Sequence, residues 1–435
     1  MRLSLLTLNI RGMEWGNTTE VRNGILRVCR DEALAACGSY PGVDIFSLHI
    51  ARPGESVRTL PVKMVAEPRC KLSREGSMFP GIVGEMKQAG VGITLALKGS
   101  AVVVTESGDE DLICRTGGFI DMSGPASAYT HYSKLFNLVL NARVNREMQK
   151  EETQAVDEAC RLAGLKLAVY VAEKCAGATP DSEKIYELPD ADPSLPGVVY
   201  VMQLLAQSPI VEDFSLYGQM AGSTMIPAIL HPNELLDGAV VNFIGSHCAV
   251  CSDKQYLYDI QNSPVIEDFF KRHGHTLRFL GVILHNEVVT LQGKIRSGVI
   301  TAKLAKMLGA DGAILCTEGH GNPDEDIMLN VKNLETGGVR TVIISDELGG
   351  RDGKSPGLAD WVPECDAMVS VGNTHELLEI PEAMGTFIGN ERSGEIIRLT
   401  DPGRIVKSGN ILTQLNYVAG SCTQGGLGHL SARWI

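Results

Sequence analysis

The sequence contains no apolar run that approaches the roughly 20 residues needed to cross a bilayer. Its first residues, MRLSLLTLNIRGMEWG, lack the long apolar core and the A-x-A-like cleavage site of a secretory signal peptide. We interpret them as a first β-strand and expect a cytoplasmic protein with no membrane partner.

Concentrated positive charge is missing as well. The chain has 39 Lys and Arg residues against 52 Asp and Glu residues, a formal net charge of −13, and the basic residues form no dense run. Because binding to nucleic acid requires a clustered cationic surface, we expect no nucleic-acid partner.

The cysteines do not form an evident disulfide framework. They are eleven, an odd number, and are scattered along the chain, which suits a reducing compartment where most thiols are small buried side chains. At 435 residues the chain is also too long for one ordinary hydrophobic core, so we expect two or three domains.

Three regions are expected from the sequence patterns. Residues 1–125 carry short alternating apolar runs such as VGITLALKGSAVVVTE and many turn residues, which predicts a β-rich domain. Residues 126–247 are expected to form an α/β middle region, with a helix from about residue 147 that ends at Gly164. Residues 248–435 alternate continuous apolar runs with helical segments, which is typical of a doubly wound, mostly parallel sheet with both faces covered. The predicted fold class is therefore α/β.

Shorter segments carry local signals. NSPVIEDFFKRHG (262–274) predicts a helix that is capped by Ser263. The segments ARPGESVR (51–58) and GGFIDMSGPASAY (117–129), rich in Gly, Pro and Ser, are expected to be loops. We expect residues 177–197, which contain four prolines, to be a surface connection.

Polar side chains follow each apolar run of the last region. The runs are FLGVIL, AILC, TVIIS and AMVSV, at residues 279–284, 313–316, 341–345 and 367–371. In open parallel sheets, ligands bind beyond the carboxyl ends of the strands, so carboxylates, imidazoles and an arginine on this edge are suited to acid–base chemistry on a small polar substrate. Polar residues also cap helices and satisfy turns, so a structural role stays open for each of them.

The segment GSHCAVC (245–251) allows four interpretations of Cys248. A redox CxxC with Cys251 requires a thiolate at a helix N-terminus, which the following SDKQYLYDIQ could supply. A zinc site requires about four ligands, and the chain has no second CxxC, so no metal site is predicted. An inert buried thiol is the default interpretation of any cysteine.

The fourth interpretation is chemical self-processing. On a strained turn, the Cys248 thiol can attack the carbonyl of the preceding residue and form a thioester. Small residues such as Gly245 and Ser246 suit such a turn, and His247 could move protons. β-Elimination then cuts the chain and leaves dehydroalanine, which hydrolyses to a pyruvoyl group. Its ketone can condense with a substrate amine and act as an electron sink.

Ordered motifs along nearly the whole chain resemble one known family. They include ARPGESVR…PVKMVAEPR, MFPGIVG, LKGSAVVVTE, GFIDMSGP, HPNELLDGAVV, HCAVCSDK, NSPVIEDFFKRHG, EGHGNPD, SDELGGRDG and the terminal LSAR. The chain is similar to the pyruvoyl-forming proprotein subunit of component B of the glycine, sarcosine and betaine reductases. The D-proline reductase proprotein is a more distant likeness.

The resemblance implies autocatalytic cleavage between His247 and Cys248, after which Cys248 becomes the pyruvoyl cofactor of the downstream fragment. Ser246 and His247 are the neighbours expected to assist. The sequence departs from the family in having His247 in place of Asn and in a CAVC spacing that is one residue shorter. If His247 prevents processing, the chain is an uncleaved scaffold or binding subunit of the same complex. A CxxC thiol redox protein is the other alternative.

The resemblance also implies an oxidoreductase that is active only with partner subunits and uses a disulfide as acceptor. Its reaction would be reductive removal of the amino group from a small amino acid or an N-methylated relative, in amino-acid fermentation. Glycine and sarcosine can form a Schiff base or iminium with the ketone, whereas betaine cannot, and the substrate stays open. The implied partners, in an oligomeric complex, are a selenocysteine-containing subunit of component B and a small carrier selenoprotein.

Site residues follow from both lines of reasoning. The edge residues expected to position the substrate and transfer protons are Glu318, Asn322, Asp346 and Glu347. The cationic residues expected to hold the substrate carboxylate are Arg351, Arg52 and Arg58.

Overall fold

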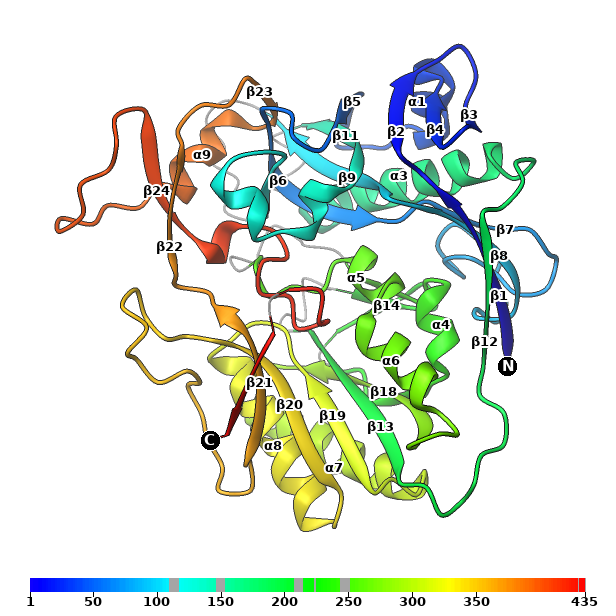
Figure 1. Ribbon diagram of the computed structural model, residues 1–435, viewed down its shortest axis with the longest axis vertical. Helices are drawn as coiled ribbons and strands as arrows, with labels where there is room; N and C mark the ends of the chain where they lie inside the picture. Colours follow the sequence, from blue (N-terminus) through cyan, green and yellow to red (C-terminus); the bar gives the residue numbers. More distant parts are fainter. Residues whose placement is uncertain are drawn as a thin grey trace.

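A computed structural model describes residues 1–108, 117–145, 153–206, 214–222, 224–242, 251–428 and 430–434. It is mixed α/β, which confirms the predicted class, and its sheets lie in an upper and a lower part of the molecule (Figure 1). None of the described helices is long and apolar enough to span a membrane.

The lower part is built on one large sheet. Its strands lie in the order β16 (Ala228–Leu230), β18 (Arg278–Glu287), β13 (Gly197–Leu205), β19 (Gly312–Cys316), β20 (Arg340–Glu347), β21 (Ala367–Asn373) and β25 (Ser431–Trp434). The strands from β18 to β21 are parallel neighbours, while β16 and β25 close the two edges in the antiparallel sense. All four apolar runs predicted as strands lie in this sheet.

Helices cover both faces of this sheet, as the side chains that alternate along β13 show. Val199 and Val201 share a buried cluster with α7 (Leu291–Met307) and α8 (Asn322–Thr336). Tyr200 and Met202 point to the other face and share a cluster with α6 (Pro264–Arg272). Strands buried on both faces need apolar side chains at every position, which explains their continuous apolar runs. The Ser263 hydroxyl accepts a hydrogen bond from the third residue of α6, so the predicted cap is confirmed.

Two larger sheets, built mainly from strands within residues 2–187, lie in the upper part and along the right side of the molecule (Figure 1). One has the order β12 (Ser182–Glu187), β1 (Arg2–Asn9), β8 (Gly92–Lys98) and β7 (Arg69–Lys71). The other has the order β10 (Gly118–Asp121), β6 (Val57–Ala66), β9 (Ser100–Ser107), β11 (Phe136–Val144) and β5 (Val43–Ala51). Helices α1 (Arg30–Cys37) and α3 (Thr153–Lys174) share its core.

Smaller elements complete the described chain. Two three-stranded sheets are formed by β2 (Gly12–Trp15), β4 (Ile25–Val28) and β3 (Glu20–Arg22), and by β15 (Gln219–Ala221), β14 (Phe214–Leu216) and β17 (Val240–Asn242). Strands β22 (Leu377–Pro381) and β24 (Asn410–Gln414) pair with each other. The short helices are η1 (Pro125–Ala128), η2 (His131–Lys134), α4 (Pro232–Leu236), α5 (Leu257–Gln261), η3 (Glu391–Ser393), α9 (Gly394–Ile397) and η4 (Leu415–Tyr417).

The two parts exchange strands along the chain. β13 and β16 precede residue 247, yet they lie in the large sheet with strands that follow it. In the opposite direction, β23 (Thr386–Gly389) pairs with β6 of the upper part. Segment 415–428 also bridges the parts, because Ala419 N donates to Phe119 O at 3.0 Å and Thr317 N donates to Gln424 Oε1 at 3.0 Å. The predicted boundaries at residues 125 and 247 stay predictions, and both sheets take strands from both sides of 247.

Two local predictions are wrong, and a third is incomplete. Gly164 does not end its helix, because α3 continues to Lys174, and an added Cβ there would lie 2.3 Å from Val104 Cγ2, so glycine permits close packing on β9. The predicted loop 117–129 contains β10. The predicted surface connection 177–197 is largely exposed, as expected, and it also contains β12. Both strands are short edge partners, which polar and turn-forming residues tolerate.

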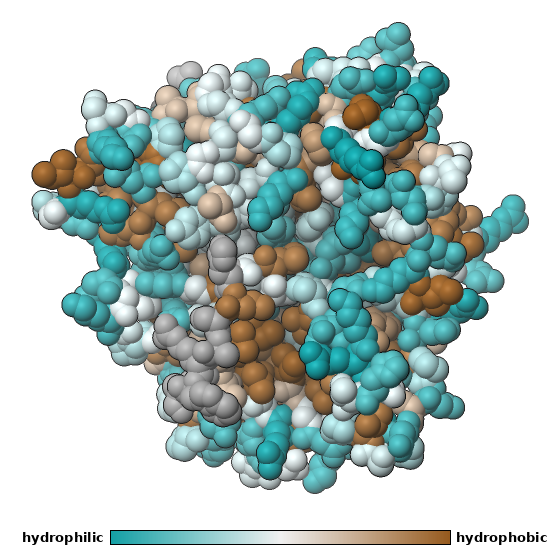
Figure 2. Space-filling view, in the orientation of Figure 1, coloured by the Kyte–Doolittle hydropathy of each residue, from teal (hydrophilic) through white to brown (hydrophobic). Residues whose placement is uncertain are grey.

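An apolar groove of about 560 Å³ lies on the α6 side of the large sheet. It is lined by Ile314, Ile344 and Val369 of neighbouring strands and by Val265 and Leu430. Figure 2 shows a continuous apolar area in the lower centre of the molecule, in the region of the large sheet.

Candidate functional site

Parallel strands of the large sheet bring several titratable side chains to one edge. β18 carries His285 and Glu287, Glu318 follows β19, and β20 ends in Asp346 and Glu347. In Figure 1, β20 and β21 run upward, so that this edge faces the middle of the molecule. None of the five side chains is more than 8% exposed. The structure therefore gathers the carboxylates as the sequence predicts, but it buries them.

Glu318 joins four segments of the chain. Its Oε1 accepts hydrogen bonds from Asn242 Nδ2 at 2.6 Å and from Gln255 N at 2.8 Å, and its Oε2 accepts one from Leu205 N at 3.0 Å. Lys254 Nζ lies 3.3 Å from Oε2, and both side chains are fully buried. Burial raises the pKa of Glu318, while the Lys254 charge and the backbone donors lower it. With both oxygens engaged, this carboxylate is placed to hold the fold together.

Ser246, His247 and Cys248, the predicted cleavage residues, lie outside the described residues, but both flanks are described. On the upstream side, Asn242 ends β17. Its Nδ2 also donates to the backbone carbonyl of Gln255, downstream of the cysteine, at 2.8 Å. Asn242 and Gln255, which flank the predicted cleavage position, are therefore in direct contact.

The downstream flank is packed under segment 415–428. Cys251 O accepts a hydrogen bond from Gly420 N at 3.3 Å, and Ser252 O accepts one from Cys422 N at 2.8 Å. Cys251 is 1% exposed and belongs to a buried cluster with Tyr132. Thiol exchange requires an accessible sulfur, so this burial disfavours the redox interpretation of the CxxC segment.

Asp253, His320 and Asp346 form a compact cluster where β19 and β20 end. His320 Nδ1 lies 3.4 Å from Asp346 Oδ2 and 3.7 Å from Asp253 Oδ2. Burial raises the pKa of Asp253 to about 7, and the charge of Asp346 adds to the rise. Burial alone would lower the pKa of His320, but its contact with Asp346 and the charge of Asp253 outweigh that effect and raise the pKa to about 9. Burial also raises the pKa of Asp346, against the opposing effect of His320.

His285 and Glu287 belong to a second buried polar group, at the end of β18. The Glu287 carboxylate accepts a hydrogen bond from the Thr317 hydroxyl. Burial raises the pKa of Glu287 well above its usual range, and the charge of Asp326 adds to the rise. Burial lowers the pKa of His285 to about 3, and the charge of Lys294 acts in the same direction. The His285 imidazole is therefore neutral at physiological pH.

Glu347 and Asn322 differ in accessibility. The Glu347 carboxylate accepts a hydrogen bond from the Ser370 hydroxyl, and its backbone carbonyl accepts one from Thr374 N at 3.1 Å. Asn322 begins α8 with an exposed side chain, and its backbone carbonyl accepts a hydrogen bond from Lys294 Nζ at 2.7 Å.

Arg58, a predicted substrate-binding residue, is 2% exposed within β6. Its Nε and Nη2 donate to the two carboxylate oxygens of Asp121 at 2.7 and 2.8 Å, and Nη2 also donates to Pro381 O at 3.0 Å. Burial raises the pKa of Asp121, and the arginine counteracts this. Arg58 thus joins the upper sheet to the last residue of β22.

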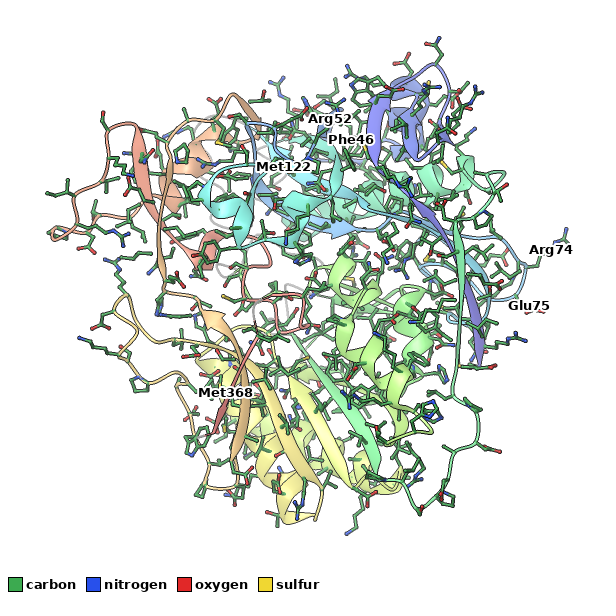
Figure 3. All side chains as sticks on the ribbon, in the orientation of Figure 1. Phe46, Arg52, Arg74, Glu75, Met122 and Met368 are labelled. Atoms are coloured by element: carbon green, nitrogen blue, oxygen red, sulfur yellow. The ribbon has the colours of Figure 1, made fainter. Side chains whose placement is uncertain are left out.

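The other two predicted arginines lie in loops that follow strands of different sheets. Arg52 Nη1 contacts Glu55 at 2.9 Å within the loop after β5. Figure 3 shows Arg52 near Met122 in the upper part of the molecule, whereas Met368 of β21 lies in the lower part. Arg351 is exposed in the loop that follows β20, and it is the predicted arginine on the strand-end side of the large sheet.

The sequence reasoning missed three residues of this site. Asp253 and Lys254 follow CAVC after one serine and are fully buried, and Asn242 is the last residue of β17 before it. The charged pair in SDK is the sequence signal for Asp253 and Lys254, but it looks like the polar start of a helix. Among the described residues, the Asp253, His320 and Asp346 group is also the set with metal-ligand spacing.

Comparison with known proteins gives a consistent result. A family model described as glycine/sarcosine/betaine reductase component B subunits matches residues 1–433. The chain is 38% identical over 439 residues, the full length of both chains, to the glycine reductase complex component B subunits alpha and beta of Peptoclostridium acidaminophilum. It is 37% identical over 440 residues, again the full length of both, to the sarcosine reductase complex component B subunit alpha of that organism.

A third relative from the same organism is the betaine reductase complex component B subunit alpha. It is 39% identical over 394 residues, which cover 88% of this chain and 86% of the relative. No solved structure matches the chain. The chain belongs to the family of glycine/sarcosine/betaine reductase component B subunits.

Proposed function

We propose that this chain is the precursor of component B of an amino-acid reductase of the glycine, sarcosine or betaine type. In this proposal the chain cuts itself between His247 and Cys248, and Cys248 becomes a pyruvoyl group at the start of the downstream fragment. The observation that carries the proposal is the pairing of the two flanks, Asn242 and Gln255, around the predicted cleavage position.

The name of one full-length relative supports a precursor. A single chain in Peptoclostridium acidaminophilum is named as two subunits, alpha and beta, and it aligns with this chain over their whole lengths. Two subunits in one translated chain require a cut, and the sequence predicts one between His247 and Cys248.

The geometry of the flanks suits self-processing. Attack by a side chain on the preceding carbonyl requires a turn that is held in a bent conformation against the chain's tendency to extend. Glu318 supplies such a constraint, because it accepts hydrogen bonds from Asn242 on one side of the turn and from Gln255 on the other. The buried ion pair of Glu318 and Lys254 would anchor the two ends of the turn.

The fold would keep the two fragments together after a cut. Strands β13 and β16 precede the predicted cleavage position and lie in the large sheet, while β23 follows it and pairs with β6 of the upper part. Separation would expose new edges in both sheets and break the hydrogen bond from the buried Arg58 to Pro381 O at the end of β22. We therefore expect the cleaved product to remain one particle.

The pyruvoyl group would supply an electrophilic carbonyl for a substrate amine. The residues of this chain would orient the substrate and manage protons at the edge of the large sheet. Arg351, exposed after β20, is placed to attract a carboxylate, and the buried Asp346 and Glu347 lie on the same strand end. The remaining partners of the proposal are a selenocysteine-containing subunit, a small carrier selenoprotein, and a small amino acid or N-methylated amine as substrate.

Denaturing electrophoresis of the purified chain tests the proposal. The wild-type chain should resolve into fragments 1–247 and 248–435, and a Cys248→Ala variant should stay at full length. Cys251→Ala is the matched control, because it removes the neighbouring thiol and should leave cleavage intact. A wild-type chain that remains uncut would instead indicate a scaffold or binding subunit of the same complex.

A further inference from the structure

The Asp253–His320–Asp346 cluster contains buried nitrogen and oxygen atoms that make no hydrogen bond to any described residue. Asp253 and Asp346 are 0% and 1% exposed. Neither oxygen of Asp253 accepts a hydrogen bond from a described residue, and neither does Asp346 Oδ2. His320 Nδ1 faces these oxygens and also has no hydrogen-bond partner among the described residues.

Two ionised carboxylates buried this close together are stabilised by a nearby cation. Burying an ionised carboxylate without a partner costs several kcal/mol or more, so buried charges in proteins are paired or coordinate metals. The charges of His320 and Lys254 lower the pKa of Asp253, but the contact that Lys254 Nζ makes at 3.3 Å is with Glu318. The His320 imidazole is the nearest candidate, and its separations of 3.4 and 3.7 Å from the two carboxylates exceed the usual hydrogen-bond range of about 2.7–3.2 Å.

The same separations fit ligands of one metal ion. Nitrogen and oxygen ligands lie about 2.0–2.2 Å from a first-row divalent cation, and in a tetrahedral site two ligand atoms are then roughly 3.4 Å apart. One ligand atom from each of the three residues lies within 4.8 Å of the other two. A small contraction around a cation would bring the set to coordination distances.

Neighbouring groups orient one of the ligands. Gln424 Nε2 donates to Asp346 Oδ1 at 2.9 Å, which leaves Oδ2 directed at His320. Gln424 is itself fixed, because its Oε1 accepts a hydrogen bond from Thr317 N at 3.0 Å. Hydrogen bonds to the second oxygen of a ligating carboxylate are a regular feature of metal sites.

We propose that this chain binds one divalent first-row cation, of the Zn²⁺ or Mn²⁺ class, through Asp253, His320 Nδ1 and Asp346 Oδ2. The imidazole favours such cations over Mg²⁺ and Ca²⁺, which prefer all-oxygen sites. Three protein ligands leave coordination positions open for water or a substrate atom, as in catalytic zinc sites. The side chain of His320 is 19% exposed, so the site has a route to solvent. The inference does not depend on cleavage at Cys248.

Metal binding to the full-length chain tests the inference. The purified protein is stripped with a chelator, dialysed against Zn²⁺ and analysed for metal content, and Co²⁺ is used in parallel for its visible absorption. We expect about one metal ion per chain, with Co²⁺ bands typical of nitrogen and oxygen ligands. His320→Asn and Asp346→Asn should each weaken binding at least 100-fold. Gln424→Ala should weaken it about 10- to 100-fold, as expected for an orienting residue.

The matched control is His285→Asn, which removes a buried imidazole at the end of β18 of the same sheet. It should keep the metal stoichiometry of the wild type. Thermal unfolding provides a second readout, because Zn²⁺ should raise the Tm of the wild type and of His285→Asn but not that of His320→Asn. Absence of binding in the wild type, or a Co²⁺ spectrum dominated by thiolate ligands, would overturn the inference, as would binding that survives both ligand variants.

Discussion

The side-chain amide of Asn242 donates a hydrogen bond to the backbone carbonyl of Gln255 at 2.8 Å, across the segment that contains Cys248. Glu318 Oε1 accepts hydrogen bonds from both residues and so fixes the same closure. The two ends of the predicted processing turn are therefore held by groups that lie outside it. The residues expected to react are thus distinct from the residues that fix the two flanks.

Replacing Glu318 by Gln should destabilise the fold strongly. The change removes the negative charge beside Lys254, which is fully buried. It also places an amide donor against either the donors of Asn242 and Gln255 or the donor of Leu205. Breaking one side of a buried ion pair costs about 3–5 kcal/mol. Urea unfolding of an uncut Cys248→Ala background measures the loss without interference from cleavage.

Asn322→Ala is the control for that measurement, because it removes an exposed side chain close to the same edge. Its free energy of unfolding should lie within about 0.5 kcal/mol of the parent. A Glu318→Gln variant as stable as its parent would show that the closure does not depend on this carboxylate.

The neutral imidazole of His285 should make stability depend on pH. Its pKa is about 3 in the folded chain, against an ordinary value of 6.5. Between these values the unfolded chain binds the additional proton, so the contribution of His285 is complete above pH 6.5 and is lost as the pH falls toward 3. The slope from this group is at most about 1.4 kcal/mol per pH unit.

Denaturant unfolding at pH 7, 6 and 5 tests this contribution, with His285→Asn as the comparison. The variant should lose less stability than the wild type over that interval, because asparagine does not titrate. Equal losses in the two proteins would contradict a depressed pKa for His285.

Gly389→Ala should weaken the contact between the two parts of the molecule. Gly389 has a φ of 114° and is paired with Leu60 of β6, and an added Cβ would lie 2.0 Å from Leu60 O. Steric overlap and an unfavourable backbone conformation together predict a loss of about 3 kcal/mol or more. Gly394→Ala is the control, because its Cβ would meet no atom within 4 Å and alanine favours the helix there. Thermal unfolding of both variants gives the comparison, and equal Tm values would contradict the role assigned to β23.

Arg58 and Arg351 should respond differently to replacement by alanine. Arg58→Ala leaves Asp121 buried without its partner, so it should lower the free energy of unfolding by about 3–5 kcal/mol. Arg351→Ala changes an exposed side chain and should leave stability within about 0.5 kcal/mol, while it raises the KM of the assembled complex for a substrate carboxylate. An unchanged KM would remove Arg351 from the site.

The sequence predicts the helices and strands that are determined by contacts between residues close together in the chain. Ser263 caps α6 through a hydrogen bond to the third residue of the helix, and the continuous apolar runs become the parallel strands of the large sheet. The order of those strands places Glu318 and Asp346 at one edge of the sheet. The alternation of strands and helices in the sequence is sufficient to predict this placement.

Residues whose role depends on distant partners could not be predicted in the same way. Gly164 reads as a helix end, but Val104 of β9 requires its small size. Arg58 reads as a loop cation, whereas its partner Asp121 lies 63 residues away in sequence. In the sequence, Asp253 looks like part of the polar start of a helix. It becomes a buried ligand candidate only because the fold brings His320 and Asp346 next to it.

The measurement closest to the central claim is the intact mass of the downstream fragment after reduction with borohydride or reaction with phenylhydrazine. A processed chain should yield fragment 248–435 with a blocked N-terminus, lighter than a cysteine-initiated fragment through loss of the sulfur and the amino group. Each reagent should add the mass expected for one ketone. A single chain of 435 residues with a free Cys248 thiol, in protein that is active with its partner subunits, would contradict the account.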